Sequence, residues 1–296
     1  MKLLLFGKTG QLGWELQRTL APLGELYALG PDELDLTNLT SLRNLIHSLQ
    51  PQIIINASAY TAVDKAEEQS DLSMALNAEA PAVMAQAADE LKASFIHYST
   101  DYVFDGTKNS AYTEDDETNP LNMYGQSKLI GEQAISQVGG AYVTLRTSWV
   151  YSLRGNGFVS KVLFWARNQE TLRIVTDQVG SPTWARMLAE TTTVMIAQSS
   201  PDTYKYFSER SGIYHLGGAG GVSRFDFTRA ILDLDSRSEE HRIKRLDPAL
   251  TLDFPTLAKR PLFTVLNCSR FERVFGLNLP SWMMALQLAM AEAKFG

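Results

Sequence analysis

The 296-residue sequence lacks the marks of a secreted, zinc-binding or nucleic-acid-binding protein. Its one cysteine, Cys268, cannot form an intrachain disulfide, and no Cys/His cluster has zinc spacing. An excess of basic residues is also missing: 27 Lys and Arg stand against 33 Asp and Glu, and the net charge of -6 disfavours a nucleic-acid-binding surface. We therefore expect a protein of the reducing cytoplasm with no nucleic-acid partner.

Long apolar runs are missing too. The apolar start at residues 3–6 stops at Gly7, so it is shorter than the roughly 7–15 residues of a signal-peptide core. No segment approaches the ~18 apolar residues that suggest a membrane span. Hydrophobic residues still make up 45% of the chain, which is enough to bury a core. The length fits one large domain or two unequal ones, with no membrane partner.

The first half of the chain alternates short apolar segments with helical patterns. Strands are expected at residues 3–6, 26–29, 52–56, 94–98 and 142–146, and helices at residues 11–20, 39–49, 72–91 and 122–138. Apolar strands that are each followed by a helix are typical of a parallel sheet covered on both faces. We therefore predict an α/β fold, a Rossmann-type doubly wound parallel sheet with a smaller α/β substrate-binding cap domain.

After Thr147 the alternation loosens. Helices are expected at residues 158–167, 184–197, 223–234 and 282–294, a strand at 172–175, and loops at 199–212 and 217–221. The sequence predicts two interleaved domains. Residues 1–146, with about 183–200, would form the dinucleotide-binding sheet domain, and about 147–182 with 201–296 the cap.

Three glycines, Gly7, Gly10 and Gly13, lie between the first strand and the first helix in the pattern G-x-x-G-x-x-G. Glycines let the backbone approach a pyrophosphate, and a helix N-terminus offers oriented N–H groups and partial positive charge. This turn is a candidate dinucleotide-binding site. A plain glycine turn is the alternative, and the strand-turn-helix setting weighs against it.

Tyr124 and Lys128 are spaced i, i+4 on a predicted helix, so their side chains lie on one face. A nearby ammonium lowers the pKa of a phenol, and such a tyrosine can protonate a carbonyl oxygen as hydride reaches the carbon. A Tyr-x-x-x-Lys pair also arises by chance in a chain with 11 tyrosines. The pair therefore needs support from other motifs.

Residues 98–104 follow the fourth strand, at the sheet edge where open α/β sheets bind ligands. Ser99 and Thr100 are adjacent on an extended chain and should point to opposite sides. We expect one of the two hydroxyls to hydrogen-bond a substrate carbonyl or Tyr124.

Taken in order, the glycine turn, residues 56–60, Ser99-Thr100 and the Tyr124/Lys128 pair resemble the extended short-chain dehydrogenase/reductase superfamily. Closer signatures are similar to the dTDP-4-dehydrorhamnose reductase family within it; they lie at residues 5–13, 60–67, 98–104, 120–125 and 146–151. The resemblance is strong to about residue 185 and weaker beyond.

The resemblance implies a role for each matching residue. Tyr124 would be the general acid, Lys128 would lower its pKa and hold the nicotinamide ribose, and Thr100 would supply the hydroxyl. The cofactor would be bound by Gly7, Gly10, Gln11, Leu12, Gly13, Asp35, Leu36, Ala59, Tyr60, Thr61, Tyr98, Tyr124 and Lys128. The substrate would be bound by Thr100, Asp101, Trp149 and Arg260, the last as a diphosphate clamp or, alternatively, a solvated surface charge.

The implied reaction is reduction of the C4 ketone of dTDP-4-dehydro-L-rhamnose to dTDP-L-rhamnose, a precursor of cell-surface polysaccharide. The cofactor would be NADPH or NADH. The second strand ends in Leu29-Gly30-Pro31 without an acidic residue for the ribose 2′-hydroxyl of NAD, and Lys8 is placed to meet a 2′-phosphate, so NADPH is favoured.

The resemblance also raises a metal site and a dimer. Some relatives are dimers bridged by a divalent ion on glutamates of the first and last helices, here Glu15 and Glu292. A third acidic position is Arg186 in this chain, which disfavours a bridging Mg²⁺. We expect no metal in the chemistry, and a monomer or homodimer.

Other activities stay open. Nucleotide-sugar dehydratases with the same Tyr/Lys pair carry Thr-Asp-Glu at the strand end, where the Glu acts as an acid. This chain has Thr100-Asp101-Tyr102 there, so that acid is missing. An epimerase of another nucleotide sugar, a reductase of a related sugar, and a non-catalytic NADP-binding subunit resembling that of methionine adenosyltransferase remain alternatives.

Overall fold

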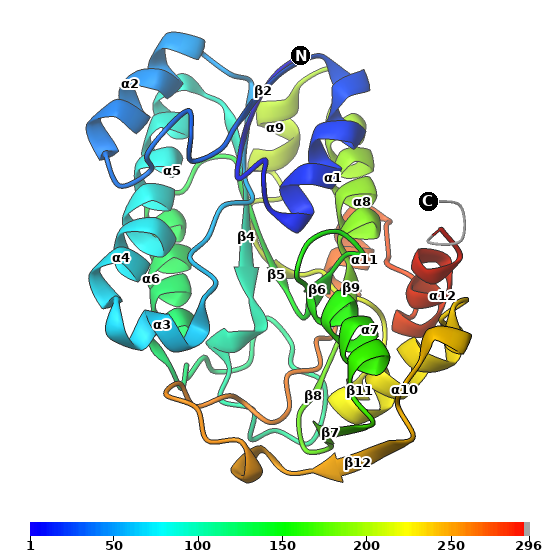
Figure 1. The fold of residues 1–296 in the computed structure, drawn as a ribbon. Helices are drawn as coiled ribbons and strands as arrows, with labels where there is room; N and C mark the ends of the chain where they lie inside the picture. Colours follow the sequence, from blue (N-terminus) through cyan, green and yellow to red (C-terminus); the bar gives the residue numbers. More distant parts are fainter. Residues whose placement is uncertain (293–296) are drawn as a thin grey trace.

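The computed structural model describes residues 1–292, with the side chain of Glu292 outside the description. Its centre is a six-stranded sheet in the order β10-β5-β4-β3-β1-β2, and every pairing in it is parallel (Figure 1). The strands are β1 (Lys2–Phe6), β2 (Glu25–Leu29), β3 (Ile53–Asn56), β4 (Ser94–Thr100), β5 (Tyr142–Thr147) and β10 (Gly212–His215). The predicted doubly wound parallel sheet is confirmed.

Helices cover both faces of this sheet because its strands are apolar on both sides. Leu3 and Leu5 face one core and Leu4 and Phe6 the other. The first face is covered by α1 (Gln11–Leu20), α8 (Ala185–Gln198), α9 (Thr203–Ser208) and α11 (Ser269–Phe275). The second face is covered by α2 (Leu39–Leu49), α5 (Ala80–Leu91) and α6 (Met123–Val138), with α3 (Val63–Glu68) and α4 (Ser70–Met74) packed on α6.

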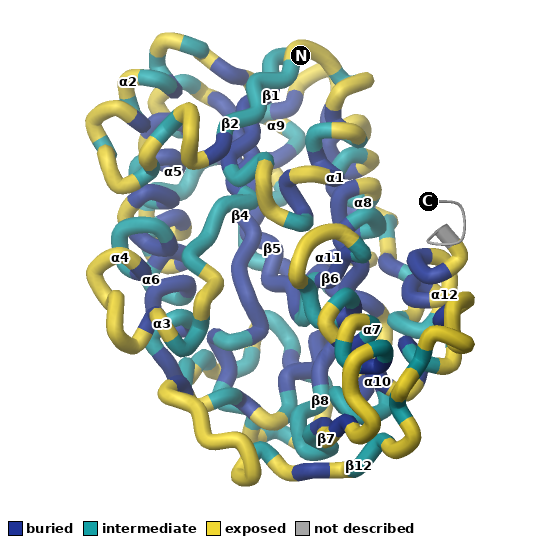
Figure 2. The backbone as a smooth tube through the Cα atoms, viewed as in Figure 1, coloured by how far each residue is buried: buried dark blue, intermediate teal, exposed yellow. Residues whose placement is uncertain are grey.

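A second, smaller lobe lies below the carboxyl ends of the central strands (Figure 1). Its helices are α7 (Phe158–Asn168), α10 (Arg224–Leu234) and α12 (Trp282–Glu292). Three two-stranded sheets complete it: β6 (Val150–Tyr151) with β9 (Thr183–Trp184), β7 (Thr171–Val175) with β12 (Arg245–Ala249), and β8 (Val179–Gly180) with β11 (Val222–Ser223). Buried residues occupy the centre of each lobe and exposed ones its periphery (Figure 2).

The loop expected at residues 199–212 is wrong. It contains α9, whose first turn is capped by Asp202 through a 3.0 Å bond from the Lys205 N–H, and whose Phe207 is fully buried in the sheet core. The strand that follows, β10, pairs with β5, although we expected the whole of residues 201–296 in the cap. The sheet lobe therefore takes in a late piece of chain.

The final helix is described as far as Glu292, so the expected extension to residue 294 lies outside the described residues. Within the described part, no helix has the length and apolar content needed to cross a bilayer.

Candidate active site

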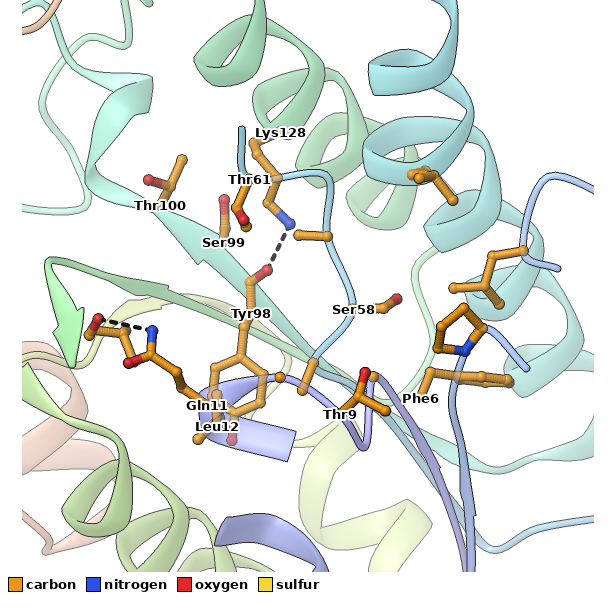
Figure 3. A pocket seen from close by; sticks show the side chains of 18 of the residues that line it. Phe6, Thr9, Gln11, Leu12, Ser58, Thr61, Tyr98, Ser99, Thr100 and Lys128 are labelled. Carbon is orange, nitrogen blue, oxygen red and sulfur yellow. Dashed lines mark hydrogen bonds between the residues drawn. The ribbon is translucent and has the colours of Figure 1, made fainter. Parts of the chain in front are cut away.

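A cleft of about 840 Å³ opens at the carboxyl ends of β1, β3 and β4, where the strand order reverses (Figure 3). Open α/β sheets bind ligands at this point. Most of the site residues expected from the sequence line it: Gly7, Gly10, Gln11, Leu12, Asp35, Leu36, Ala59, Thr61, Tyr98, Thr100, Asp101, Tyr124, Lys128 and Trp149. Gly13, Tyr60 and Arg260 do not.

The glycine turn is shaped by backbone contacts. Gly7 has φ +88°, and a Cβ at Gly13 would lie 1.9 Å from the Gly7 carbonyl oxygen. The role of Gly13 is therefore to let α1 pack closely on the turn, and Gly13 itself does not line the cleft. The N-cap of α1, Gly10, provides no side-chain cap. The first N–H groups of α1 therefore keep their hydrogen-bonding capacity for an anion in the cleft.

Gln11 connects this turn to the second lobe. Its Oε1 accepts a 2.8 Å bond from the Ser152 N–H, and its Nε2 donates to the Val150 carbonyl at 3.5 Å (Figure 3). The start of α1 is therefore tied directly to the segment that follows Trp149, and Gln11, Trp149 and Val150 all line the cleft.

An acidic side chain does stand at the end of β2, contrary to our expectation. Glu33 accepts a 2.9 Å bond from the Gly30 N–H and forms an ion pair with Lys8. The pKa of Glu33 is lowered, first by the Lys8 hydrogen bond and then by the Gly30 N–H. We did not identify Glu33 from the sequence because it stands three residues after Gly30. The turn between them brings its carboxylate back to the end of β2. Lys8 and Glu33 therefore lie together where an adenine ribose would bind.

The helix that carries Tyr124 and Lys128 is held tightly. Its N-cap, Asn122, accepts a 2.9 Å bond from the Gly125 N–H. A Cβ at Gly125 would lie 2.3 Å from the Tyr102 carbonyl oxygen, so only glycine permits this packing. The buried Asn77, in the π-helical turn Ala75–Glu79, donates a 3.0 Å bond to Ser127 of the same helix. Sequence reasoning did not single out Asn77.

Lys128 is 1% exposed, and its Nζ donates a 2.7 Å bond to the Tyr98 carbonyl (Figure 3). Nζ also lies 3.0 Å from Nε2 of His97, a residue that the sequence analysis did not single out. Burial lowers the pKa of Lys128 to about 8. The sequence predicted that Lys128 lowers the pKa of Tyr124. In this arrangement burial instead raises the pKa of Tyr124, with a contact from Thr100 acting in the opposite direction.

The two hydroxyls that follow β4 differ in their partners. Thr100 Oγ1 donates to Asp101 at 3.2 Å and accepts from the Tyr102 N–H at 3.2 Å, besides its contact with Tyr124. Ser99 Oγ is buried, lines the cleft and has no hydrogen-bond partner in the described structure. Asp101 is 2% exposed and accepts a 2.8 Å bond from Ser148 Oγ, and burial raises its pKa.

Trp149 lines the cleft next to Val150. Its φ is +44°, which is rare for a bulky residue and marks a strained position, and a Cβ at Gly180 would lie 2.4 Å from its ring. Arg224 lies over this ring and that of Phe158, with its guanidinium carbon 3.4 Å and 4.7 Å from the two ring centres. Among the described residues, the Arg224 side chain has no ion pair or hydrogen bond. Sequence reasoning missed it.

Arg260, the expected diphosphate clamp, is already paired. Its Nη2 lies 2.6 Å from Asp64 Oδ2, and its Nη1 donates to Thr256 at 2.6 Å and to the Ala258 carbonyl. This cluster fastens residues 256–260 to α3. Arg260 therefore stands outside the cleft, with its charge balanced by Asp64.

Cations of the chain itself lie beside Glu15, one of the two candidate metal ligands that the resemblance raised. Glu15 Oε2 lies 3.5 Å from Arg186 Nε and 3.8 Å from Arg18 Nη1. In the part of the chain that the structure describes, no cluster of three or more His, Cys, Asp or Glu side chains is suited to a metal. Glu292, the second candidate ligand, has its side chain outside that part.

The cleft fits a nicotinamide dinucleotide. It combines uncapped helix N–H groups at the glycine turn with the unpartnered, buried hydroxyls of Ser99 and Thr147 near Tyr124. Orphaned buried hydroxyls cost free energy unless a ligand satisfies them. A phosphate of the ligand would accept bonds from the helix N–H groups. Polar groups at the reactive end of the ligand would bond to the two hydroxyls.

Comparison with known proteins gives one consistent result. The family described as RmlD substrate binding domain matches residues 1–295. The dTDP-4-dehydrorhamnose reductase of Burkholderia thailandensis is 40% identical over 295 residues, covering 99% of both chains, and that of Escherichia coli is 38% identical over 299 residues, covering 99% and 98%.

Solved structures agree. A dTDP-4-dehydrorhamnose reductase from Clostridium acetobutylicum superposes with a TM-score of 0.90 at 34% identity, covering 99% of this chain and 100% of that one. The enzyme from Bacillus anthracis, solved in complex with NADP, gives 0.88 at 32% identity over the same shares. With the glycine turn, Thr100 and the Tyr124/Lys128 pair gathered in one cleft, the full-length match shows that this chain belongs to the RmlD family, that of the dTDP-4-dehydrorhamnose reductases.

Proposed function

We propose that the protein reduces the C4 ketone of dTDP-4-dehydro-L-rhamnose to dTDP-L-rhamnose with NADPH, or with NADH. The observation that carries the proposal is the position of Tyr124. Its phenol lies against Thr100 in the cleft that begins at the glycine turn, so one cavity can hold a dinucleotide and a carbonyl compound together. The relatives of the same family and nearly the same length carry this activity in their names.

Tyr124 is the proton donor in this proposal. Because burial raises its pKa, the phenol keeps its proton at neutral pH, which is the form that a general acid needs. The Thr100 hydroxyl orients the phenol and the ketone oxygen, and Lys128 holds the cofactor side of the cleft. When bound, the nicotinamide supplies the hydride that reaches the carbonyl carbon.

The substrate would extend from Tyr124 past Asp101 towards Trp149. Asp101 is fixed by Ser148 and Thr100, so it can accept a hydrogen bond from a sugar hydroxyl without moving. Arg224, stacked on Trp149, is a cation without a hydrogen-bonded carboxylate among the described residues. We propose that it faces the diphosphate of the nucleotide sugar, a role for which Arg260 is less suited because Asp64 already pairs with it.

The test is consumption of NADPH with enzymatically made dTDP-4-dehydro-L-rhamnose. Tyr124→Phe should lower kcat by at least about 10²-fold and change NADPH affinity far less, because the proton donor is removed while Lys128 and the glycine turn remain. Tyr102→Phe is the matched control, since its ring lies 5.7 Å from that of Tyr124 and its phenol is also buried.

The outcomes separate the alternatives. Folded protein that binds NADPH but shows no turnover would favour another sugar or a non-catalytic subunit. Full activity in Tyr124→Phe would refute the role given to that phenol.

A further inference from the structure

A second cavity, of about 530 Å³, opens beside the glycine turn. It adjoins the cleft described above, because both are lined by Thr9, Gly10, Gln11 and Thr61. Its remaining lining residues are Trp14 of α1 and residues 154–157, which form the loop before α7 in the second lobe. The two lobes therefore meet at this cavity, next to the turn that is expected to hold the diphosphate of the cofactor.

Arg154 is the only charged residue among the described residues that line this cavity. Its guanidinium carbon lies 3.8 Å from the ring centre of Trp14. This contact uses the flat face of the guanidinium and leaves the N–H groups, which lie in its plane, available for hydrogen bonds. Within the described structure, the Arg154 side chain has no ion pair and no hydrogen bond. The cation is therefore held in place by Trp14 without being neutralised.

The loop that carries Arg154 is fastened to the helix that begins at the glycine turn. The Arg154 N–H donates to Ser152 Oγ at 3.2 Å, and the Ser152 N–H donates to Gln11 Oε1 at 2.8 Å. At the other end of the loop, a Cβ at Gly157 would lie 2.8 Å from the same Gln11 oxygen. The position of Arg154 relative to the turn is thus fixed by close contacts at both ends of the loop.

The charge around this cavity favours an anion. Two helices begin here, α1 after Gly10 and α7 after Gly157, and neither N-cap residue provides a side-chain cap. Helix N-termini carry partial positive charge. No acidic side chain from the described part of the chain lines the cavity. Lys8, the other cation of the turn, is already paired with Glu33. Arg154 is thus the full positive charge that an anion at this place would meet.

We propose that Arg154 binds the diphosphate of the nicotinamide dinucleotide from the second lobe, while the N–H groups of α1 hold it from the first. A guanidinium offers phosphate oxygens two parallel N–H bonds. A nucleotide sugar also carries a diphosphate, but Arg154 lies beside Gly10 and Gln11 rather than beside Trp149 and Arg224. The proposal rests on the proposed function only in requiring that the cofactor binds. It makes cofactor affinity depend on the lobe that holds the sugar.

The experiment measures the dissociation constants of NADPH and NADH by fluorescence titration, with no sugar present. Arg154→Met keeps an apolar contact with Trp14 and removes the charge, so it should weaken both cofactors about tenfold, the size of one charge-assisted hydrogen bond. Arg154→Lys should recover most of this loss, because an ammonium still attracts phosphate. Arg18→Met is the matched control, since this exposed arginine of α1 lies outside both cavities and should change neither constant.

Salt and a second ligand separate a charge from a packing effect. The ratio of the Arg154→Met and wild-type constants should fall by about half or more when salt rises from about 20 mM to about 500 mM, because ions screen the charge. A loss of packing alone would leave the ratio unchanged and would overturn the proposal. The affinity for dTDP should stay the same in Arg154→Met, and a loss there would assign the arginine to the nucleotide sugar instead.

Two further outcomes would refute the role of Arg154. One is unchanged affinity for both cofactors in folded Arg154→Met. The other is a loss for NADPH alone, which would place the arginine at the 2′-phosphate. None of these measurements uses turnover. A failure of the same wild-type protein to reduce dTDP-4-dehydro-L-rhamnose would therefore count against the proposed function and leave the role of Arg154 standing.

Discussion

The guanidinium of Arg224 is stacked on the ring of Trp149, with its carbon 3.4 Å from the ring centre. To reach this position, Trp149 adopts a left-handed backbone conformation, which is unfavourable for a bulky residue. Trp149 lines the cleft, and Arg224 brings a positive charge to the ring of this lining residue.

We predict that Arg224→Ala raises KM for the nucleotide sugar about tenfold and leaves kcat within about twofold, because the positive charge proposed to face the diphosphate is lost from substrate binding. Arg229→Ala, an exposed arginine on the same helix, serves as the control. Steady-state kinetics at low ionic strength would check this. An unchanged KM would remove Arg224 from the substrate site.

The Lys8–Glu33 pair should govern the choice of cofactor. The carboxylate of Glu33 repels a 2′-phosphate, while Lys8 attracts it and neutralises Glu33. Glu33→Gln should therefore raise the ratio of kcat/KM for NADPH over NADH by about five- to tenfold, and Lys8→Met should lower it. Asp32→Asn, next to Glu33 but without the Lys8 contact, should leave the ratio unchanged. Equal ratios in all four proteins would show that the ribose phosphate binds elsewhere.

The two glycines at the start of α1 should separate folding from binding. At Gly13 a Cβ would meet the Gly7 carbonyl at 1.9 Å, so Gly13→Ala should destabilise the fold by several kcal/mol and lower Tm. At Gly10 the nearest contact would be an ordinary 3.4 Å. Gly10→Ala should keep Tm near wild type and weaken NADPH binding, because the methyl group stands where the phosphates approach. Thermal unfolding and fluorescence titration would test both; the reverse pattern would contradict this account of the turn.

Stability should fall in mild acid because of His215, which is completely buried on β10. Its Nδ1 lies 3.1 Å from the Tyr112 carbonyl, and its Nε2 has no partner among the described residues. Burial first, and Arg146 second, lower its pKa to about 3. The unfolded chain binds a proton below about pH 6.5 and the native state does not, so the free energy of unfolding should drop by about 2 kcal/mol between pH 7 and pH 5 from this residue.

His215→Asn keeps an N–H donor for the Tyr112 carbonyl and cannot be protonated in this range. Urea unfolding at the two pH values should therefore show a smaller drop for the variant. If wild type and variant lost equal stability, another group would be responsible.

The sheet was predictable because its strands are short apolar runs with a helix after each. The helices expected at residues 39–49, 122–138 and 223–234 match α2, α6 and α10, and in the structure Asn122 and Ser223 cap the last two. Helix α9 was missed because only Phe207 and Asp202 carry its signal in a polar segment. No local pattern could show that β10 joins the sheet, since that depends on which distant strand lies at the edge.

The site was predictable where residues act through local spacing, as in the glycine turn and the Tyr124/Lys128 pair. It was not predictable where a side chain is placed by packing from another part of the chain. Arg224 contacts Trp149 although the two are 75 positions apart in the sequence. His97 contacts Lys128 only because packing places the Lys128 side chain against β4. Glu33 was hidden by a turn that returns its carboxylate to Gly30.

The late contributions to the sheet lobe have a consequence for synthesis. Strand β10 forms one edge of the sheet, and Phe271 and Phe275 of α11 cover part of its first face. A nascent chain that has emerged only to about residue 200 carries the glycine turn, Tyr124 and Lys128, yet exposes the edge of β5 and an apolar face. The sheet lobe therefore cannot bury its complete core until β10 and α11 have been synthesised.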